Sequence, residues 1–179
     1  MDRVRAALQQ LLEGHDPYPG VVIDRVWNVV LANPAAARFT ALLPPELVTP
    51  GVNVFRACLH PDGLAGRTRN FDEWGSYLVG QLRRLKALTN DPGVAELLDE
   101  VTGYPTVAAL GPANQASGDE PALLVPWALQ LGAAELSLFT TLTTFGTPRD
   151  ITLDEVAIEL FYPADEPTAR LLAEAGATD

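Results

Sequence analysis

The sequence predicts an α+β fold, in which a five-stranded antiparallel sheet carries its helices on one face. Two β-branched runs, at 21–25 and 27–32, predict a strand hairpin near the N-terminus. Three runs near the C-terminus alternate apolar and polar residues, at 123–131, 135–145 and 155–162. The segments between these groups have helical spacing. We therefore expect the N-terminal pair of strands to join the other three non-locally.

The first half of the chain has clear helix boundaries. Residues 2–13 are amphipathic and predict a helix, which the turn-forming run 14–20 ends. Asn33-Pro34 is a cap followed by a proline at the first helical position, and it predicts a helix over 34–43. A shorter helix is expected at about 53–59.

The strongest helical pattern covers residues 71–89, where large apolar residues recur at i+3 and i+4. A second helix is predicted over 92–102 and a last one over 165–175. Residues 113–121 are rich in small and polar residues and indicate a loop.

Composition excludes several classes of function. The chain has 12 Lys and Arg against 23 Asp and Glu, a net charge of −11, so the chain as a whole would repel nucleic acid. No apolar run is long enough to cross a bilayer, and the N-terminus lacks the pattern of a signal peptide. We expect a cytoplasmic protein without membrane contact. Cys58 is the single cysteine, and we interpret it as a small buried hydrophobe rather than a reactive thiol.

Nothing in the sequence argues for catalysis or for a metal. His15 and His60 have no ligand partner at i+3 or i+4, and the phosphate-binding and hydrolase motifs are absent. Four acidic residues gather near the C-terminus, and we interpret them as a solvated edge: Asp150, Asp154, Glu155 and Glu159. We therefore expect a protein that is not an enzyme and has no metal or resident cofactor.

The predicted strand 135–145 carries threonines on both faces, in the run Phe139-Thr140-Thr141-Leu142-Thr143-Thr144-Phe145. High β-propensity explains this run without any ligand. Alternatively, one or two hydroxyls face a cavity and orient the head group of a ligand, with Phe139 and Phe145 along its apolar part.

Two short segments resemble the opening of PAS-type sensor domains: Ile23-Asp24-Arg25 and Leu31-Ala32-Asn33-Pro34-Ala35-Ala36. The resemblance implies a PAS-like fold that holds a small molecule between its sheet and its helices. An ordinary hairpin and capped helix in another α+β fold is the alternative.

A second resemblance covers about residues 3–172. Residues 136–153, with Thr143-Thr144-Phe145-Gly146-Thr147-Pro148, and residues 159–166 resemble the MmyB-like ligand-binding domain of XRE-type helix-turn-helix regulators. The resemblance implies a sensor for fatty-acid-like ligands that follows an N-terminal DNA-binding domain. Residues 1–14 would then be the connecting helix and 15–179 the sensor domain, so any contact with DNA would be made by a domain outside this chain.

An apolar ligand would need a cavity lined by large side chains and one polar anchor. We predict a lining that comprises Phe39, Phe55, Trp74, Leu78, Leu82, Trp127, Phe139 and Phe145. Arg67, Arg69 or a strand threonine, Thr141 or Thr143, would supply the anchor. Taken one by one, the lining residues are better explained as plain core than as pocket. The alternative function is a PAS-like module with a filled core that forms a homodimer and binds no ligand; a homodimer is also expected for the sensor.

Overall fold

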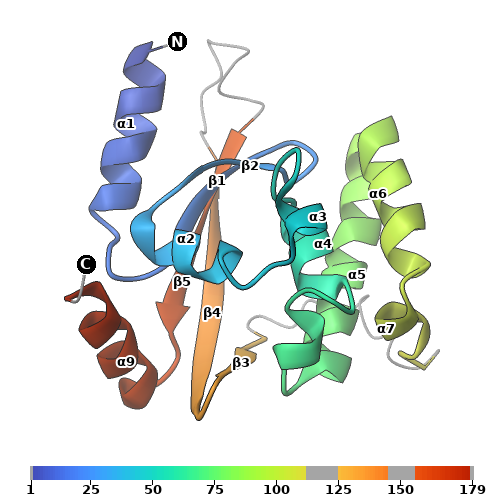
Figure 1. Ribbon diagram of the computed structural model, residues 1–179. Helices are drawn as coiled ribbons and strands as arrows, with labels where there is room; N and C mark the ends of the chain where they lie inside the picture. The colour runs from blue at the N-terminus through green and yellow to red at the C-terminus, as the bar shows by residue number, and fades with distance from the viewer. Residues whose placement is uncertain (1, 112–124, 145–155, 178–179) are drawn as a thin grey trace.

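The computed structural model describes residues 2–111, 125–144 and 156–177. Its five strands form one antiparallel sheet in the order β2-β1-β5-β4-β3 (Figure 1). The strands are β1 (Gly20–Asp24), β2 (Val29–Ala32), β3 (Trp127–Leu131), β4 (Ala134–Thr144) and β5 (Val156–Pro163). The N-terminal pair of strands joins the other three through the pairing of β1 with β5, as expected, and this pairing places β5 at the centre of the sheet. The prediction of a PAS-like α+β fold is confirmed.

Most of the helices lie on one face of this sheet. One group follows β2 and packs on one face, the helix-facing side: α2 (Pro34–Thr40), α3 (Pro45–Val48), α4 (Val54–Leu59), the 3₁₀ helix η1 (Ala65–Arg67), α5 (Phe71–Thr89), α6 (Pro92–Thr102) and α7 (Pro105–Ala108). The last helix, α9 (Glu166–Gly176), lies against β4 and β5. None of the helices in the described ranges is long and apolar enough to cross a membrane.

The first helix, α1 (Asp2–Glu13), differs from the prediction that all helices share one face. Its Leu8 and Leu12 pack on Val22 of β1 and Ile158 of β5. These two strand residues point away from Val21, which belongs to the main core, because successive side chains of a strand alternate between faces. Helix α1 therefore covers the opposite side of the sheet, as Figure 1 shows.

The β1–β2 hairpin is shorter than predicted and is bulged. Strand β2 begins at Val29 instead of residue 27, and Trp27 lies in the turn with φ 66°. Val22 pairs with Leu31 and Ile23 with Val29, so Val30 is an extra residue. This bulge puts Val29 and Leu31 on opposite faces, although strict alternation predicted one face for both.

Two buried asparagines fix the chain around the hairpin. The side-chain oxygen of Asn33 accepts from the backbone N–H groups of Gly20 and Ala36, and its amide donates to the carbonyls of Tyr18 and Leu12. Asn53 likewise caps α4 and donates to the carbonyl of Val26. Asn33 thus joins the end of α1, the start of β1 and the start of α2.

Most other predicted elements are confirmed with small shifts of their ends. Helix α2 ends at Thr40 instead of residue 43, and α3, η1 and α7 were not predicted. The predicted loop 113–121 lies outside the described residues.

Candidate ligand-binding site

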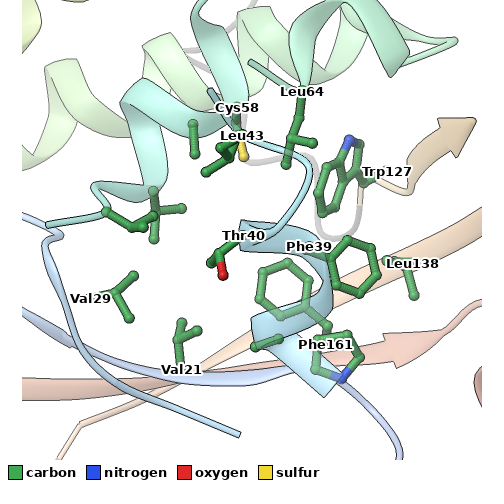
Figure 2. Close-up of a pocket in the computed structure, with 15 residues that line it drawn as sticks. Val21, Val29, Phe39, Thr40, Leu43, Cys58, Leu64, Trp127, Leu138 and Phe161 are labelled. Carbon is green, nitrogen blue, oxygen red and sulfur yellow. The ribbon is translucent and has the colours of Figure 1, made fainter. Parts of the chain in front are cut away.

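An apolar cavity lies between the sheet and helices α2 and α4 (Figure 2). Its volume is about 60 Å³. The lining comprises Pro19, Val21, Val29, Ala36, Phe39, Thr40, Leu43, Val52, Val54, Ala57, Cys58, Leu64, Trp127, Leu138 and Phe161. The Thr40 hydroxyl donates to the carbonyl of Ala37 at 2.8 Å, and burial raises the pKa of the Cys58 thiol, which stays neutral. The cavity therefore offers a dry, uncharged lining.

A larger groove lies on the other side of Phe39, between α2, α9 and the β3–β4 turn. Its volume is about 450 Å³. The lining is mostly apolar and includes two arginines: Ala35, Arg38, Phe39, Leu42, Arg67, Leu131, Gly132, Ala134, Leu136, Leu171, Leu172 and Ala175. Phe39 contributes to both hollows, and on β4 the neighbouring inward residues Leu138 and Leu136 line the cavity and the groove respectively. The Phe39 ring is thus a wall between the cavity and the groove.

Stacked aromatic rings form the side of the cavity next to α5. Trp127 is parallel to Trp74, with ring centroids 5.7 Å apart, and its indole N–H donates to the Thr68 hydroxyl at 2.9 Å. Phe39 and Phe161 lie 6.3 Å and 6.0 Å from the Trp127 ring. The hydrogen bond and the stack hold Trp127 in one orientation, so this side of the cavity is rigid.

A buried carboxylate lies on the same side of the sheet as the cavity. Glu159 of β5 is 6% exposed, and the Thr140 hydroxyl donates to it. Its Oε2 atom has no hydrogen-bond partner among the described residues. Burial raises the pKa of Glu159 to about 7, and the hydrogen bond from Thr140 opposes this rise. Leaving such an acceptor unpaired costs on the order of 1–3 kcal/mol.

The family of the chain follows from its sequence. The model of the MmyB-like transcription regulator ligand binding domain matches residues 4–175. The chain belongs to this family. This confirms the resemblance that was stated from the sequence.

Other comparisons add little to this MmyB-like domain. Among solved structures, the PAS domain of BvgS from Bordetella pertussis aligns over 99% of this chain and 97% of its own, with 12% identity and a TM-score of 0.39. No curated protein matches.

The structure of this MmyB-like domain brings three of the predicted site residues together. Phe39 and Trp127 line the cavity, and Arg67 lines the groove beside Phe39. Their contact with a ligand stays a prediction. Other predicted lining residues are buried in the main core but line neither hollow: Phe55, Trp74, Leu78 and Leu82. Arg69 is exposed, and its guanidinium lies 3.6 Å from the Glu135 carboxylate.

Three predicted residues of β4 lie away from the cavity: Phe139, Thr141 and Thr143. Thr140 pairs with Phe161 and Thr141 with Leu160, so Thr141 shares the α1 side of the sheet with Leu160. Phe139 stacks on Tyr162, with centroids 5.3 Å apart. The sequence analysis assigned the residues of this strand to two faces correctly, but it predicted that the face with Phe139 would be the one toward the cavity. Phe145, on that same predicted face, lies outside the described residues.

Sequence reasoning missed Glu159 as a member of the interior. We predicted a solvated edge for it, but β5 is the central strand of the sheet and Glu159 shares a face with Phe161. The prediction that the N-terminal pair joins the other strands non-locally did not say which strand it pairs with, and the structure shows that β1 and β4 cover both edges of β5. Asp150, Asp154 and Glu155 lie outside the described residues.

A second charged group joins α4 to α6 and is exposed. The Arg56 guanidinium donates to both carboxylate oxygens of Glu100, with distances of 2.7–3.0 Å, and the Tyr104 hydroxyl donates to the same carboxylate at 2.5 Å. The hydrogen bond from Arg56 lowers the pKa of Glu100, and burial raises that of Tyr104. This group holds two helices together. In the described part of the chain, no three acidic, histidine or cysteine side chains gather in a metal-binding arrangement.

Proposed function

We propose that this chain is the effector-sensing domain of a transcription regulator, which binds a small, fatty-acid-like ligand and thereby modulates DNA binding by a helix-turn-helix domain outside this chain. Membership in a family of regulator ligand-binding domains supports the proposal. In this proposal the sensor is a cytoplasmic homodimer and has no enzymatic activity.

The observation that carries the proposal is the shared Phe39 wall. Pockets for small ligands usually measure about 300–1,000 Å³, a range that includes the groove of about 450 Å³ but not the cavity of about 60 Å³. A turn of the Phe39 ring would join the two hollows, and an acyl chain could then pass from the groove into the cavity. Each methylene buried there stabilises the complex by about 0.8 kcal/mol.

Arg67 is the anchor that we propose for the carboxylate of such a ligand. It lies at the end of η1, is exposed and lines the groove. A guanidinium binds a carboxylate through two parallel hydrogen bonds, so it fixes the head group at the outer end while the chain points inward.

We propose that the signal passes through β1 to α1. Val21 lines the cavity, and its neighbour Val22 packs against Leu8 and Leu12 on the other face. A ligand that displaces β1 would therefore also displace α1, which we propose as the connecting helix within residues 1–14. Such coupling requires the ligand to bind one arrangement of α1 more tightly than the other.

Titration with saturated fatty acids of eight to sixteen carbons tests the proposal. We expect the wild-type protein to bind at least one of them and Arg67→Ala to weaken that binding by about tenfold, the loss expected for a charge-assisted hydrogen bond. Arg5→Ala, a change at an exposed position of α1, is the matched control and should bind as the wild type does. A wild-type protein that binds none of these acids contradicts the proposal.

The small size of the cavity favours a second function, a module that dimerises without a ligand. Leu11 of α1 and Val30 of β2 are 54% and 46% exposed and would be available to a second copy. A dimer whose dissociation constant is the same with and without fatty acid would favour this second function over the sensor.

A further inference from the structure

We infer that the ligand of this domain carries a hydrogen-bond donor at its buried end, a hydroxyl, amide or amine that pairs with Oε2 of Glu159. This inference rests on the proposed function, because it assumes an apolar ligand that reaches the inner cavity. It adds the chemistry that the far end of that ligand must have.

Glu159 does not itself line the cavity, but its neighbours in the sheet do. On its rung of the sheet it lies between Val21 of β1 and Leu142 of β4, and Phe161 follows two residues later on the same face. Val21 and Phe161 both line the cavity. Cys58, whose side chain points into the space between the helices and the sheet in Figure 2, lies close enough to Glu159 for its thiol to respond to the carboxylate charge.

The hydrogen bonding of Glu159 is incomplete. A carboxylate offers about four acceptor sites on two oxygens, and buried carboxylates are normally paired. Glu159 receives a hydrogen bond from Thr140, while Oε2 has no partner among the described residues. Because burial holds the pKa of Glu159 at about 7, the group is an acceptor-only carboxylate at pH 8. An atom of this kind needs a donor, and a ligand that extends past the lining residues Val21 and Phe161 can supply it.

A second unpartnered atom belongs to the same region. The indole N–H of Trp74 is buried without an acceptor in the described residues. Trp74 stacks on Trp127, which lines the cavity, and its ring lies tilted against Tyr77, whose pKa responds to the charge of Glu159. Among the residues that the structure describes, this region therefore holds one donor and one acceptor without a hydrogen-bond partner. A hydroxyl or an amide both donates and accepts, so it complements this pair, whereas a second carboxylate would be repelled by Glu159.

The experiment compares each saturated fatty acid of eight to sixteen carbons with its ω-hydroxy counterpart, so that the two ligands differ at the buried end alone. Binding is measured at pH 8 on the wild-type protein, on Glu159→Gln and on Glu96→Gln. Glu96 is exposed on α6, so Glu96→Gln removes the same charge from a position outside both hollows. We expect the wild type and Glu96→Gln to bind one ω-hydroxy acid about tenfold more tightly than its plain counterpart, and Glu159→Gln to lose most of this preference.

The outcomes separate the inference from the proposed function. If plain acids bind and the ω-hydroxyl group brings no gain in the wild type, the inference is wrong and the proposed function stands. The same holds if the preference persists in Glu159→Gln. If neither series binds the wild type, the proposed function fails and the inference fails with it. The wild-type comparison needs no variant, so it decides the question even if Glu159→Gln does not fold.

Discussion

Asn33 and Glu159 are both buried polar residues, but the fold satisfies them differently. Every hydrogen-bonding group of the Asn33 side chain has a partner, in the first helix, the first strand and the second helix. Glu159 has one donor and an oxygen without a partner in the described part of the chain, and its neighbours Val21 and Phe161 line the cavity. The first arrangement stabilises the fold. The second reduces its stability, as is common at positions that serve a ligand.

Glu159 should make the stability of the domain fall as pH rises. Its pKa is about 7 in the folded protein and 4.5 in the unfolded chain, so the folded state binds more protons between these values. The free energy of unfolding therefore decreases as pH rises from 4.5 to about 7, and Glu159 does not change it below pH 4.5. Relative to the wild type, we expect Glu159→Gln to gain up to roughly 3 kcal/mol in free energy of unfolding between about pH 4.5 and pH 7.

Urea unfolding across this pH range measures that difference. Glu96→Gln is again the control, and its curve should run parallel to that of the wild type. Parallel curves for Glu159→Gln and the wild type would contradict the account of Glu159.

Asn33→Ala should destabilise the protein by about 2–4 kcal/mol, because it removes a helix cap and leaves the carbonyls of Leu12 and Tyr18 without their donor. Asn33→Asp keeps the cap oxygen but loses the two donated hydrogen bonds, so we expect an intermediate loss. The measurement is the free energy of unfolding in urea. A change below about 0.5 kcal/mol in Asn33→Ala, the range typical of surface substitutions, would show that Asn33 does not hold these elements together.

At the scale of elements, patterns with a strong local cause were predictable. The long helix α5 and the strand β4 have clear periods of 3.6 and 2, and Asn33-Pro34 marks the start of α2. The ends of elements were less predictable. Trp27 fits the alternating pattern of a strand. The chain turns before it, however, because the Asp24 carboxylate accepts hydrogen bonds from the backbone N–H groups of Val26 and Asn28.

The choice between the two faces of a strand could not be made from the strand alone. Strand β4 carries threonines on both faces, and its inward face is fixed by its register with β5. That register depends on contacts between distant parts of the chain and cannot be derived from the strand itself. For this reason the prediction placed Phe139, Thr141 and Thr143 on the cavity side. Phe39 and Arg67 were predicted only as a large apolar side chain and as one of several possible anchors, and the structure places them at the cavity and the groove.

Helix α2 meets both hollows, as β4 does, and through Phe39 it should control access between them. Its residues Ala36, Phe39 and Thr40 follow helical spacing and line the cavity, while Ala37 points to solvent. Ala35, Arg38 and Phe39 line the groove. The short length of α2, seven residues, leaves its position dependent on the Asn33 cap and on packing.

At the scale of the molecule, the sheet separates a hollow helical side from the side that α1 covers. Strand β1 contacts both sides through adjacent residues, and β5 carries Glu159 on one face and Ile158 on the other. A change in the volume enclosed between the sheet and the helices would therefore act on α1 directly through β1. In the function that we propose, this arrangement would convert the binding of an apolar molecule into a movement of α1.

The most direct test of this account is fatty-acid binding to Ala36→Val, with Ala37→Val as the matched control on the same helix. Both changes add two methyl groups and the same β-branched helix penalty, but the first fills the cavity of about 60 Å³ and the second points to solvent. We expect Ala36→Val to weaken binding about tenfold or more while its unfolding free energy changes by less than about 1.5 kcal/mol. Ala37→Val should bind as the wild type does. Equal affinity in Ala36→Val and Ala37→Val would contradict the claim that a ligand occupies the space between the sheet and its helices.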